Sequence, residues 1–209
     1  MRSLLSSVLQ SASENTEHAL NDADVLLLEE NERLKVELGH LRLQLIELER
    51  VADTDPLVPL YNRRAFIREL SRAQTVSLRY DITSTVVYFD LDNFKSVNDI
   101  YDHSVGDEVL KTIAAALQTH VRDCDVIARI GGDEFAALLF KTDIDQAFRK
   151  ADEVSQTFSG KVEMLNLPKL DVSVSWGVAE CIANTDPEDI LSRADGQMFA
   201  NKRREQQAS

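Results

Sequence analysis

The sequence is poor in residues that cross-link or interrupt a chain. Its 209 residues include two cysteines, four prolines and seven glycines. The two cysteines, Cys124 and Cys181, cannot build a disulfide framework and fit a reducing compartment, so we expect a cytoplasmic protein in which each thiol is a small apolar residue or is idle. The low glycine and proline contents also exclude the collagen-like and low-complexity classes.

Positive charge and long apolar runs are scarce as well. Lysine and arginine number 23 against 36 acidic residues, which gives a formal net charge of −13. This charge disfavours nonspecific binding to nucleic acid or to an anionic membrane surface, so we expect neither as a partner. The sequence contains no run of 18 apolar residues, so we expect no membrane-spanning helix. A phosphate-bearing substrate would need cations from its own binding site.

What is present indicates one globular domain with an extension. Hydrophobic residues make up 44% of the sequence and charged residues 28%, a balance typical of helix-rich globular chains. The extension is residues 20–52, which lack proline and space their leucines at alternating steps of four and three. This spacing is a heptad pattern. Its d positions are Leu27, Leu34, Leu41 and Leu48, and its a positions are Asn31, Leu38 and Leu45.

Two interpretations of this leucine seam are open. A lone amphipathic helix that packs on its own domain would show the same apolar face. A parallel coiled-coil homodimer is favoured by the asparagine at an a position, which fixes register, and by charges at g and e. In a parallel pair, Glu30 would face Lys35 of the second copy, and Glu37 would face Arg42. We therefore predict a dimerisation helix here, with residues 1–19 as an N-terminal tail.

From residue 53 to about residue 202, helical and strand patterns alternate, and we assign residues 53–209 to one domain. Pro56 ends the long helix, since it cannot continue one. Interleaved patterns around one antiparallel hairpin predict an α/β domain with a mixed sheet and flanking helices. The expected helices are 62–74, 104–120, 144–158 and 187–202, and the expected strands are 85–90, 127–130, 135–140 and 170–179.

The tip of the predicted hairpin carries Gly131, Gly132, Asp133 and Glu134. Two adjacent carboxylates on a turn repel each other and pack poorly, which calls for a reason beyond folding. Ordinary turn acids are one explanation. A metal-binding pair is the other, with glycines that let phosphate groups approach the backbone.

A second acidic cluster supports the metal interpretation. Asp90 and Asp92 end a buried strand, and alternation puts both on one side. If the hairpin lies beside this strand, Asp90 converges with Asp133 and Glu134, and three carboxylates need a cation among them. Oxygen ligands without nearby His or Cys select Mg²⁺ or Mn²⁺. Two such ions bridging a triphosphate would stabilise attack by a hydroxyl and departure of pyrophosphate.

These motifs resemble those of the GGDEF family, the diguanylate cyclases. Residues 131–135 spell the family signature, and residues 89–99 (FDLDNFKSVND) resemble its FxDxDxFKxxND stretch. The resemblance covers residues 53–202. It extends to Asp55, Leu57, Leu60, Asn62, Arg63 and Arg64 at the start of the domain, to His103, Gly106 and Asp107, to Ser175, Trp176, Gly177 and Val178, and to Ala194 and Asp195.

The resemblance implies a palm-like mixed sheet with flanking helices, as in nucleotidyl cyclases, preceded here by a long coiled-coil helix. It implies an enzyme that joins two GTP molecules into cyclic di-GMP and releases two pyrophosphates. Each domain would hold one GTP, so two domains must face each other. The predicted coiled coil would raise the effective concentration of the second domain.

The resemblance also implies roles for individual residues. Asp90, the carbonyl of Leu91 and Asp133 would ligate two Mg²⁺ ions, with Glu134 assisting. Asp133 would help deprotonate the attacking 3′-hydroxyl, and Lys95 would stabilise charge on the phosphates. The further substrate contacts would be the backbone amides of Asn93 and Phe94, the side chains of Asn98 and Asp107 at guanine, His103 in the same pocket, and Lys202 at phosphate.

Guanine recognition by Asp107 has a physical reason. One carboxylate can accept both N1–H and N2–H of guanine, which adenine does not offer. The alternative for Asn98 and Asp107 is helix capping, since both lie near the start of the helix predicted at 104–120.

A regulatory site is implied next to the signature. Arg122 and Asp125 form an RxxD motif shortly before Gly131, where diguanylate cyclases bind their product as an inhibitor. The arginine would take phosphate and guanine edges. As a bare pattern, RxxD is more often a surface ion pair.

The chain departs from the family pattern at several positions. Val58 and Pro59 replace Thr-Gly in the turn that opens the domain, and Asp102 replaces a glycine before His103. Aspartate tolerates left-handed conformations better than most residues. Gln206 stands where the family has an arginine, which bears on triphosphate affinity.

Two competing classes are a catalytically weak GGDEF module that senses cyclic di-GMP or GTP, and a structural coiled-coil adaptor. The presence of a complete set of predicted metal-site residues argues against the sensor, because a sensor need not keep a metal site. The adaptor leaves both acidic clusters unexplained. A signalling partner at the N-terminal coil is a further expectation, because no sensor domain is recognisable in the sequence.

Overall fold

The computed structural model describes residues 2–165 and 172–208, with the backbone alone described at 2–26, 29 and 204–208. The chain forms two compact units, residues 1–52 and 53–209. Within the described residues, no helix is long and apolar enough to cross a bilayer.

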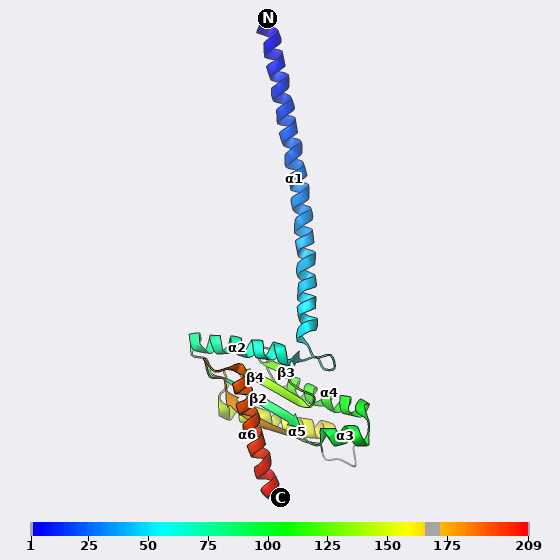
Figure 1. The fold of residues 1–209 in the computed structure, drawn as a ribbon, viewed down its shortest axis with the longest axis vertical. Coiled ribbons are helices and arrows are strands. Elements are labelled where there is room, and N and C mark those ends of the chain that lie inside the picture. Colours follow the sequence, from blue (N-terminus) through cyan, green and yellow to red (C-terminus); the bar gives the residue numbers. More distant parts are fainter. Residues whose placement is uncertain (1, 166–171, 209) are drawn as a thin grey trace. The chain divides into compact units, whose positions relative to one another are not determined.

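The first unit is one long helix, α1 (Arg2–Asp53) (Figure 1). The dimerisation helix was predicted from residue 20, and the backbone is helical from Arg2, so residues 2–19 of the expected tail are helical as well. The seam leucines from Leu34 to Leu48 have 47–67% of their surface exposed. Lys35 pairs with Glu32 of its own chain at 2.7 Å, and the pairing of Lys35 with a second copy stays a prediction.

The second unit is built on a five-stranded sheet of order β1-β3-β4-β2-β5. β1 and β3 are parallel and the other neighbours are antiparallel, so the predicted mixed sheet is confirmed. The strands are β1 (Tyr61–Asn62), β2 (Ser84–Leu91), β3 (Val126–Arg129), β4 (Glu134–Phe140) and β5 (Val174–Glu180). The helices are α2 (Arg63–Tyr80), α3 (Phe94–Ile100), α4 (His103–His120), α5 (Ile144–Glu163) and α6 (Pro187–Ala208).

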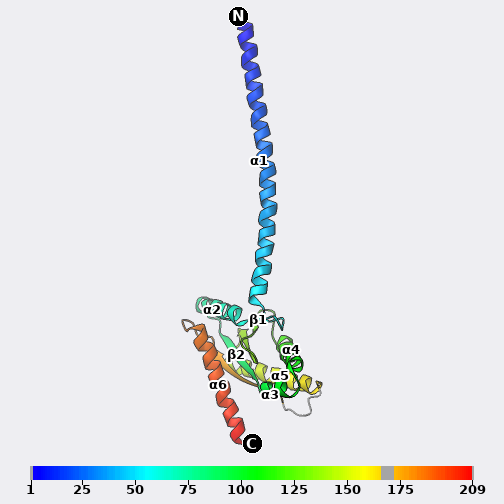
Figure 2. The same ribbon diagram turned by 45° about the vertical axis from the view of Figure 1, so that its right-hand side comes forward.

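Helices cover both faces of this sheet. Figure 2 shows α2 and α6 on one side and α4 and α5 on the other. Alternation along β2 sends Val86 and Tyr88 into the core under α2 and α6, and Val87 and Phe89 into the core under α4 and α5. The helices contribute Phe66, Leu70, Ile190 and Leu191 to the first core, and Ile113, Leu117, Ala151 and Phe158 to the second.

Element boundaries differ from the predictions mainly where side-chain pattern is weak. Helix α2 extends to Tyr80 rather than residue 74, and ends at Asp81, which adopts the left-handed conformation. Helix α3 was not predicted, because its seven residues are too few to show a helical period. Strand β5 begins at Val174 rather than residue 170, and residues 170–171 lie outside the described part.

Candidate active site

Strand pairing brings the two acidic motifs together. In the register of β2 and β4, Asp90 is directly opposite Glu134. The backbone N–H of Leu91 donates to the carbonyl of Asp133 at 3.2 Å. The adjacency expected from the sequence is therefore present, because the hairpin strand β4 is the neighbour of β2.

The two hairpin glycines are not required by an unusual backbone conformation, and a side chain would be crowded only at Gly131. Neither glycine has a positive φ. A Cβ on Gly131 would lie 2.0 Å from a carboxylate oxygen of Glu134, whereas a Cβ on Gly132 would meet open space. Gly131 thus allows the Glu134 side chain to fold back on the turn. The open side of Gly132 leaves room for a ligand group near the backbone.

The carboxylate of Glu134 also contacts Tyr88. Burial raises the pKa of the Tyr88 phenol, and a hydrogen bond with Glu134 raises it further. Tyr88 lies in the core under α2 and α6, so Glu134 is directed to this face of the sheet. The sequence analysis did not identify Tyr88.

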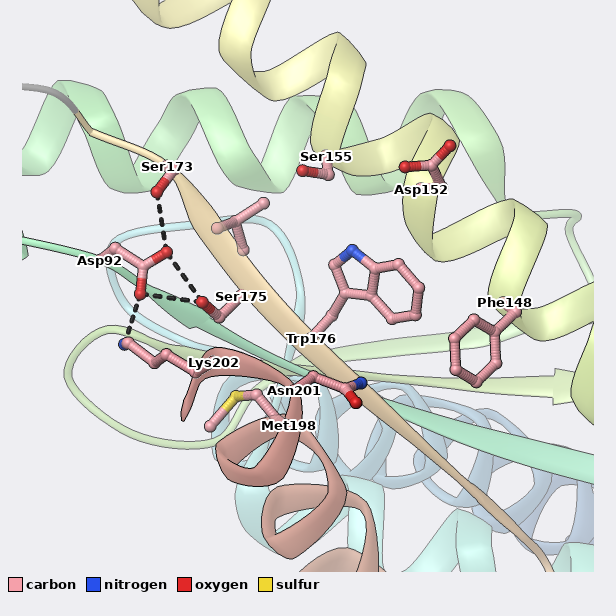
Figure 3. Close-up of a pocket in the computed structure, with 11 residues that line it drawn as sticks. Asp92, Phe148, Asp152, Ser155, Ser173, Ser175, Trp176, Met198, Asn201 and Lys202 are labelled. Atoms are coloured by element: carbon pink, nitrogen blue, oxygen red, sulfur yellow. Dashed lines mark hydrogen bonds and ion pairs between the residues drawn. The ribbon is translucent and has the colours of Figure 1, made fainter. Parts of the chain in front are cut away.

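Lys202 of α6 is placed between Asp90 of β2 and Asp92, the residue that follows the strand. Its Nζ lies 3.2 Å from Oδ2 of Asp90 and forms an ion pair with Oδ1 of Asp92 (Figure 3). Burial lowers the pKa of Lys202, but its contacts with Asp92 and Asp90 outweigh burial and leave the pKa raised. The ammonium group is therefore charged at neutral pH.

The surroundings of Asp90 favour a nearby cation. Burial raises the pKa of Asp90, the contact with Lys202 opposes this rise, and the negative charges of Asp133 and Asp92 add to it. Across the described part of the chain, no three His, Cys, Asp or Glu side chains are grouped to hold a metal ion as they stand. The register of β2 and β4 thus brings the three acidic residues together, but their side chains do not converge. Lys202 contacts the carboxylate of Asp90, and Glu134 contacts Tyr88 instead. The donors are hard oxygen ligands that suit Mg²⁺ or Mn²⁺, and Lys202 provides positive charge where such an ion would bind.

Helices α3 and α4 bring the predicted guanine residues close together. A Cβ on Gly106 would lie 2.1 Å from Oδ1 of Asn98 and 3.4 Å from the Phe94 ring, so Gly106 lets both side chains pack against α4. Asp107 is the next residue of α4 and is partly buried. His103 begins the same helix and is exposed, and Lys95 is exposed on α3.

The capping alternative for these residues is wrong. The N-cap of α4 is Asp102, whose carboxylate accepts from Ser104 N at 2.8 Å and Val105 N at 3.1 Å. Asn98 lies within α3, and Asp107 lies within α4. Asp102 has a φ of 141°, a conformation that favours glycine, and its capping bonds hold the turn in place of that glycine.

The predicted RxxD motif forms a turn that is anchored to β4. Asp125 accepts from the backbone N–H of Arg122 at 2.9 Å and from that of Phe140 at 3.0 Å. The carboxylate thus has a structural role, while the Arg122 side chain is exposed. Of the departures, Val58 is buried in the core, and the side chain of Gln206 lies outside the described residues.

A cavity of about 490 Å³ lies beside Lys202, at the outer edge of β5 (Figure 3). Ser173 and Ser175 point toward Asp92 on one side of the strand, and Trp176 and Phe148 lie on the other. Ser175 was predicted only as one of the family-like residues 175–178, and its contact with Asp92 was not predicted. Lining residues include Asp152, Ser155, Met198 and Asn201.

Comparisons with known proteins all point to one family. Residues 52–208 match the family described as "Diguanylate cyclase, GGDEF domain". Diguanylate cyclase DgcM of Escherichia coli is 35% identical over 158 residues, which are 75% of this chain and 37% of DgcM. Response regulator PleD of Caulobacter vibrioides is 35% identical over 172 residues, 78% of this chain and 37% of PleD. The chain thus spans well under half the length of these relatives.

Solved structures show the same fold. The coiled coil and GGDEF domain of DgcB from Caulobacter crescentus, in complex with c-di-GMP, has a TM-score of 0.70 and 26% identity, with 85% of this chain and 94% of that chain covered. Diguanylate cyclase SiaD of Pseudomonas aeruginosa, in complex with its activator SiaC, has a TM-score of 0.70 and 28% identity, with 95% and 78% covered. The expected palm-like mixed sheet is confirmed, and the chain belongs to the GGDEF family.

Proposed function

We propose that this chain is a diguanylate cyclase that condenses two GTP molecules into cyclic di-GMP and two pyrophosphates. The observation that carries the proposal is the pairing of β2 with β4, which sets Asp90 opposite Glu134 and brings Leu91 to Asp133. The family match over residues 52–208 supports the same chemistry.

Asp90, Asp133 and the carbonyl of Leu91 would hold Mg²⁺ or Mn²⁺, with Glu134 assisting. When bound, the ions supply positive charge to the triphosphate and the attacking oxygen. Lys202 now contacts Asp90 at 3.2 Å and would release it to the metal. Asp90 would therefore have a positively charged partner both with and without the metal ion.

The remaining residues of the site would bind and orient GTP. Asp133, at the hairpin tip, accepts the proton of the 3′-hydroxyl. The exposed ammonium of Lys95 and the backbone amides of Asn93 and Phe94 neutralise charge that develops on the phosphates. Asn93 has a φ of 61° and is the N-cap of α3, so both amides lie at the short turn between β2 and α3.

Asn98 and Asp107 would select guanine. Asn98 packs against Gly106, the residue before Asp107, and this proximity along α4 supports a shared role for the two residues. His103 begins the same helix and would line the pocket. A carboxylate that accepts two guanine N–H groups loses both bonds with adenine.

Joining two GTP molecules, one held by each domain, would need a second domain, which a parallel homodimer through α1 supplies. The exposed leucine seam of α1 is the surface that supports this proposal. The similarity to SiaD, solved with its activator, covers 95% of this chain and motivates the expectation of a signalling partner at the N-terminal coil.

Product would inhibit the enzyme at Arg122 and Asp125. Asp125 holds the turn through the backbone of Arg122, and this presents the exposed guanidinium to solvent. In Arg122→Ala, we expect the concentration of cyclic di-GMP that halves the rate to rise about tenfold or more. Arg149→Ala, an exposed arginine of α5, is the matched control; equal inhibition of both variants would contradict the site.

A catalytically weak sensor of cyclic di-GMP or GTP is the second candidate. The observation in its favour is the side-chain arrangement among the described residues, where Lys202 rather than a third carboxylate adjoins Asp90.

The deciding experiment is incubation of the whole chain with GTP and Mg²⁺, followed by chromatography of the nucleotides. We expect cyclic di-GMP and pyrophosphate from the parent, and at least about a hundredfold lower rate from Asp133→Asn. Asp145→Asn, an exposed acid of α5, should keep the parent rate. Binding of cyclic di-GMP without any product would establish the sensor instead.

A further inference from the structure

The carboxylate of Asp92 has side-chain partners at the start of β5 and on α6. Ser173 Oγ donates to its Oδ2 at 2.8 Å, and Ser175 Oγ lies 2.9 Å from both carboxylate oxygens. The ion pair with Lys202 completes this set (Figure 3). Asp92 therefore joins the end of β2 to the edge strand β5 and to helix α6.

These contacts fix the position of the Asp92 carboxylate. Its side chain is only 15% exposed, and a carboxylate with so little access to water needs hydrogen-bond donors and a cation as partners. Two hydroxyl donors and one ammonium satisfy that need. The hydroxyls also orient the carboxylate, so its direction toward Lys202 is set by β5 and does not depend on the lysine.

Asp90 and Asp92 contact Lys202 in different ways. Asp90 faces the hairpin acids across the β2–β4 pair, whereas Asp92 is bonded to β5 on the other side. If Asp90 were used to hold a metal ion, Lys202 would lose that partner and would keep Asp92. Asp92 is the contact that can retain the ammonium in the site during catalysis.

We infer that Asp92 is a positioning residue, which acts through Lys202 to hold its ammonium group at the triphosphate of bound GTP. The inference rests on the proposed function for the identity of the nucleotide. Without Asp92, the flexible lysine side chain would have to be ordered by the nucleotide alone, and ordering it costs conformational entropy. Nucleotide affinity should therefore fall.

The test is a double-mutant cycle on nucleotide binding by the whole chain. The probe is a GTP analogue with a methylene group between the α and β phosphates, which cannot release pyrophosphate, in the presence of Mg²⁺. The dissociation constant is measured by calorimetry for the parent, Asp92→Asn, Lys202→Met and the double variant. We expect Asp92→Asn to bind about tenfold more weakly, and the double variant to bind no more weakly than Lys202→Met.

Asp152→Asn is the matched control. Asp152 lines the same cavity, but its carboxylate is bonded to Gln156 at 2.8 Å. Its removal changes the charge of the cavity and leaves Lys202 in place, so the affinity should not fall. Ser175→Ala keeps the charge of Asp92 and removes one orienting hydroxyl, so it should weaken binding by a smaller factor if Asp92→Asn does not fold.

Three results would overturn the inference: unchanged or tighter binding by Asp92→Asn, multiplicative losses in the double variant, or equal losses in Asp92→Asn and Asp152→Asn. Product formation is measured on the same samples. A parent that binds the analogue but forms no product would remove the proposed activity, while the binding cycle would still decide the role of Asp92.

Discussion

The guanidinium of Arg129 forms an ion pair with the carboxylate of Asp55 at 3.3 Å, and both side chains are about 15% exposed or less. Arg129 Nη2 also donates to the carbonyl of Gly132 at 2.7 Å. Asp55 in turn accepts from the backbone amides of Leu57 and Val58. One arginine therefore connects the turn that opens the domain with the tip of the signature hairpin.

Loss of the Arg129 contacts with Asp55 and Gly132 should reduce cyclase activity by more than the accompanying loss of stability would by itself. In Arg129→Gln, Asp55 keeps a mostly buried charge without its partner, which should lower the free energy of unfolding by about 2 kcal/mol. The hairpin tip loses a bond beside Asp133, so we expect cyclase activity to fall about tenfold or more. Denaturant unfolding and the rate of cyclic di-GMP formation measure the two effects.

Arg63→Gln is the matched control for that variant. Arg63 pairs with Glu188 on the surface, where both side chains are about half exposed. Exposed pairs contribute about 0–1 kcal/mol, so stability and activity should stay close to the parent values. Equal effects of the two substitutions would show that the Arg129 link has no special role.

The contribution of Asp53 to stability should depend on pH. A hydrogen bond with Arg68 lowers the pKa of Asp53, burial opposes this, and Arg64 adds to the lowering. Because the folded pKa is below the unfolded one, the stabilisation is present above the ordinary aspartate pKa and is lost as pH falls through the folded value. Asp53→Asn should lower the thermal midpoint at pH 7, and the difference should shrink in acid. A difference that stays constant with pH would contradict the ion pair; Asp123→Asn serves as an exposed control.

Two substitutions at Asp102 separate backbone strain from capping. Asp102→Ala removes the bonds to Ser104 and Val105 and keeps an unfavourable φ of 141°. Asp102→Gly removes the same bonds and relieves the strain. We expect the alanine variant to have the lower thermal midpoint of the two. Equal midpoints would mean that the conformation of residue 102 costs little.

Cys124 offers a chemical probe of the RxxD turn. It is exposed between Arg122 and Asp125, whereas Cys181 is buried and burial raises the pKa of its thiol to about 11. One equivalent of a maleimide should therefore label Cys124 alone in the folded protein. The label would obstruct Arg122, so labelled enzyme should need more cyclic di-GMP for inhibition. Cys124→Ser, treated in the same way, should keep the inhibition of the untreated parent.

The oligomeric state should depend on the seam of α1. Lysine at Leu34 and Leu41 would place charges at two d positions, so the double variant should be monomeric by light scattering. At submicromolar protein its activity should fall about a hundredfold, since the second domain is no longer held nearby. Leu43→Lys is the matched control, because Leu43 is 67% exposed and lies outside the a and d positions. A monomeric double variant with full activity would refute the dimer mechanism.

Patterns over a few neighbouring residues were sufficient for the architecture. The heptad spacing predicted the long helix, and the apolar runs on both sides of Gly131 and Gly132 predicted the hairpin that the structure contains. Period and turn chemistry act locally, so they can be read without the fold. Helix α3 was missed because seven residues show too little period.

The amino-acid sequence alone was enough to identify the family and the mixed sheet and to predict candidate acidic residues, because motif spacing and strand alternation are properties of consecutive residues. The tertiary structure decided which partners those acids have. Lys202 reaches Asp90 and Asp92, and Arg129 reaches Asp55, only because strands and helices distant in sequence pack side by side. Such contacts depend on strand order, side-chain direction and burial, and these are set by the packing of the whole domain.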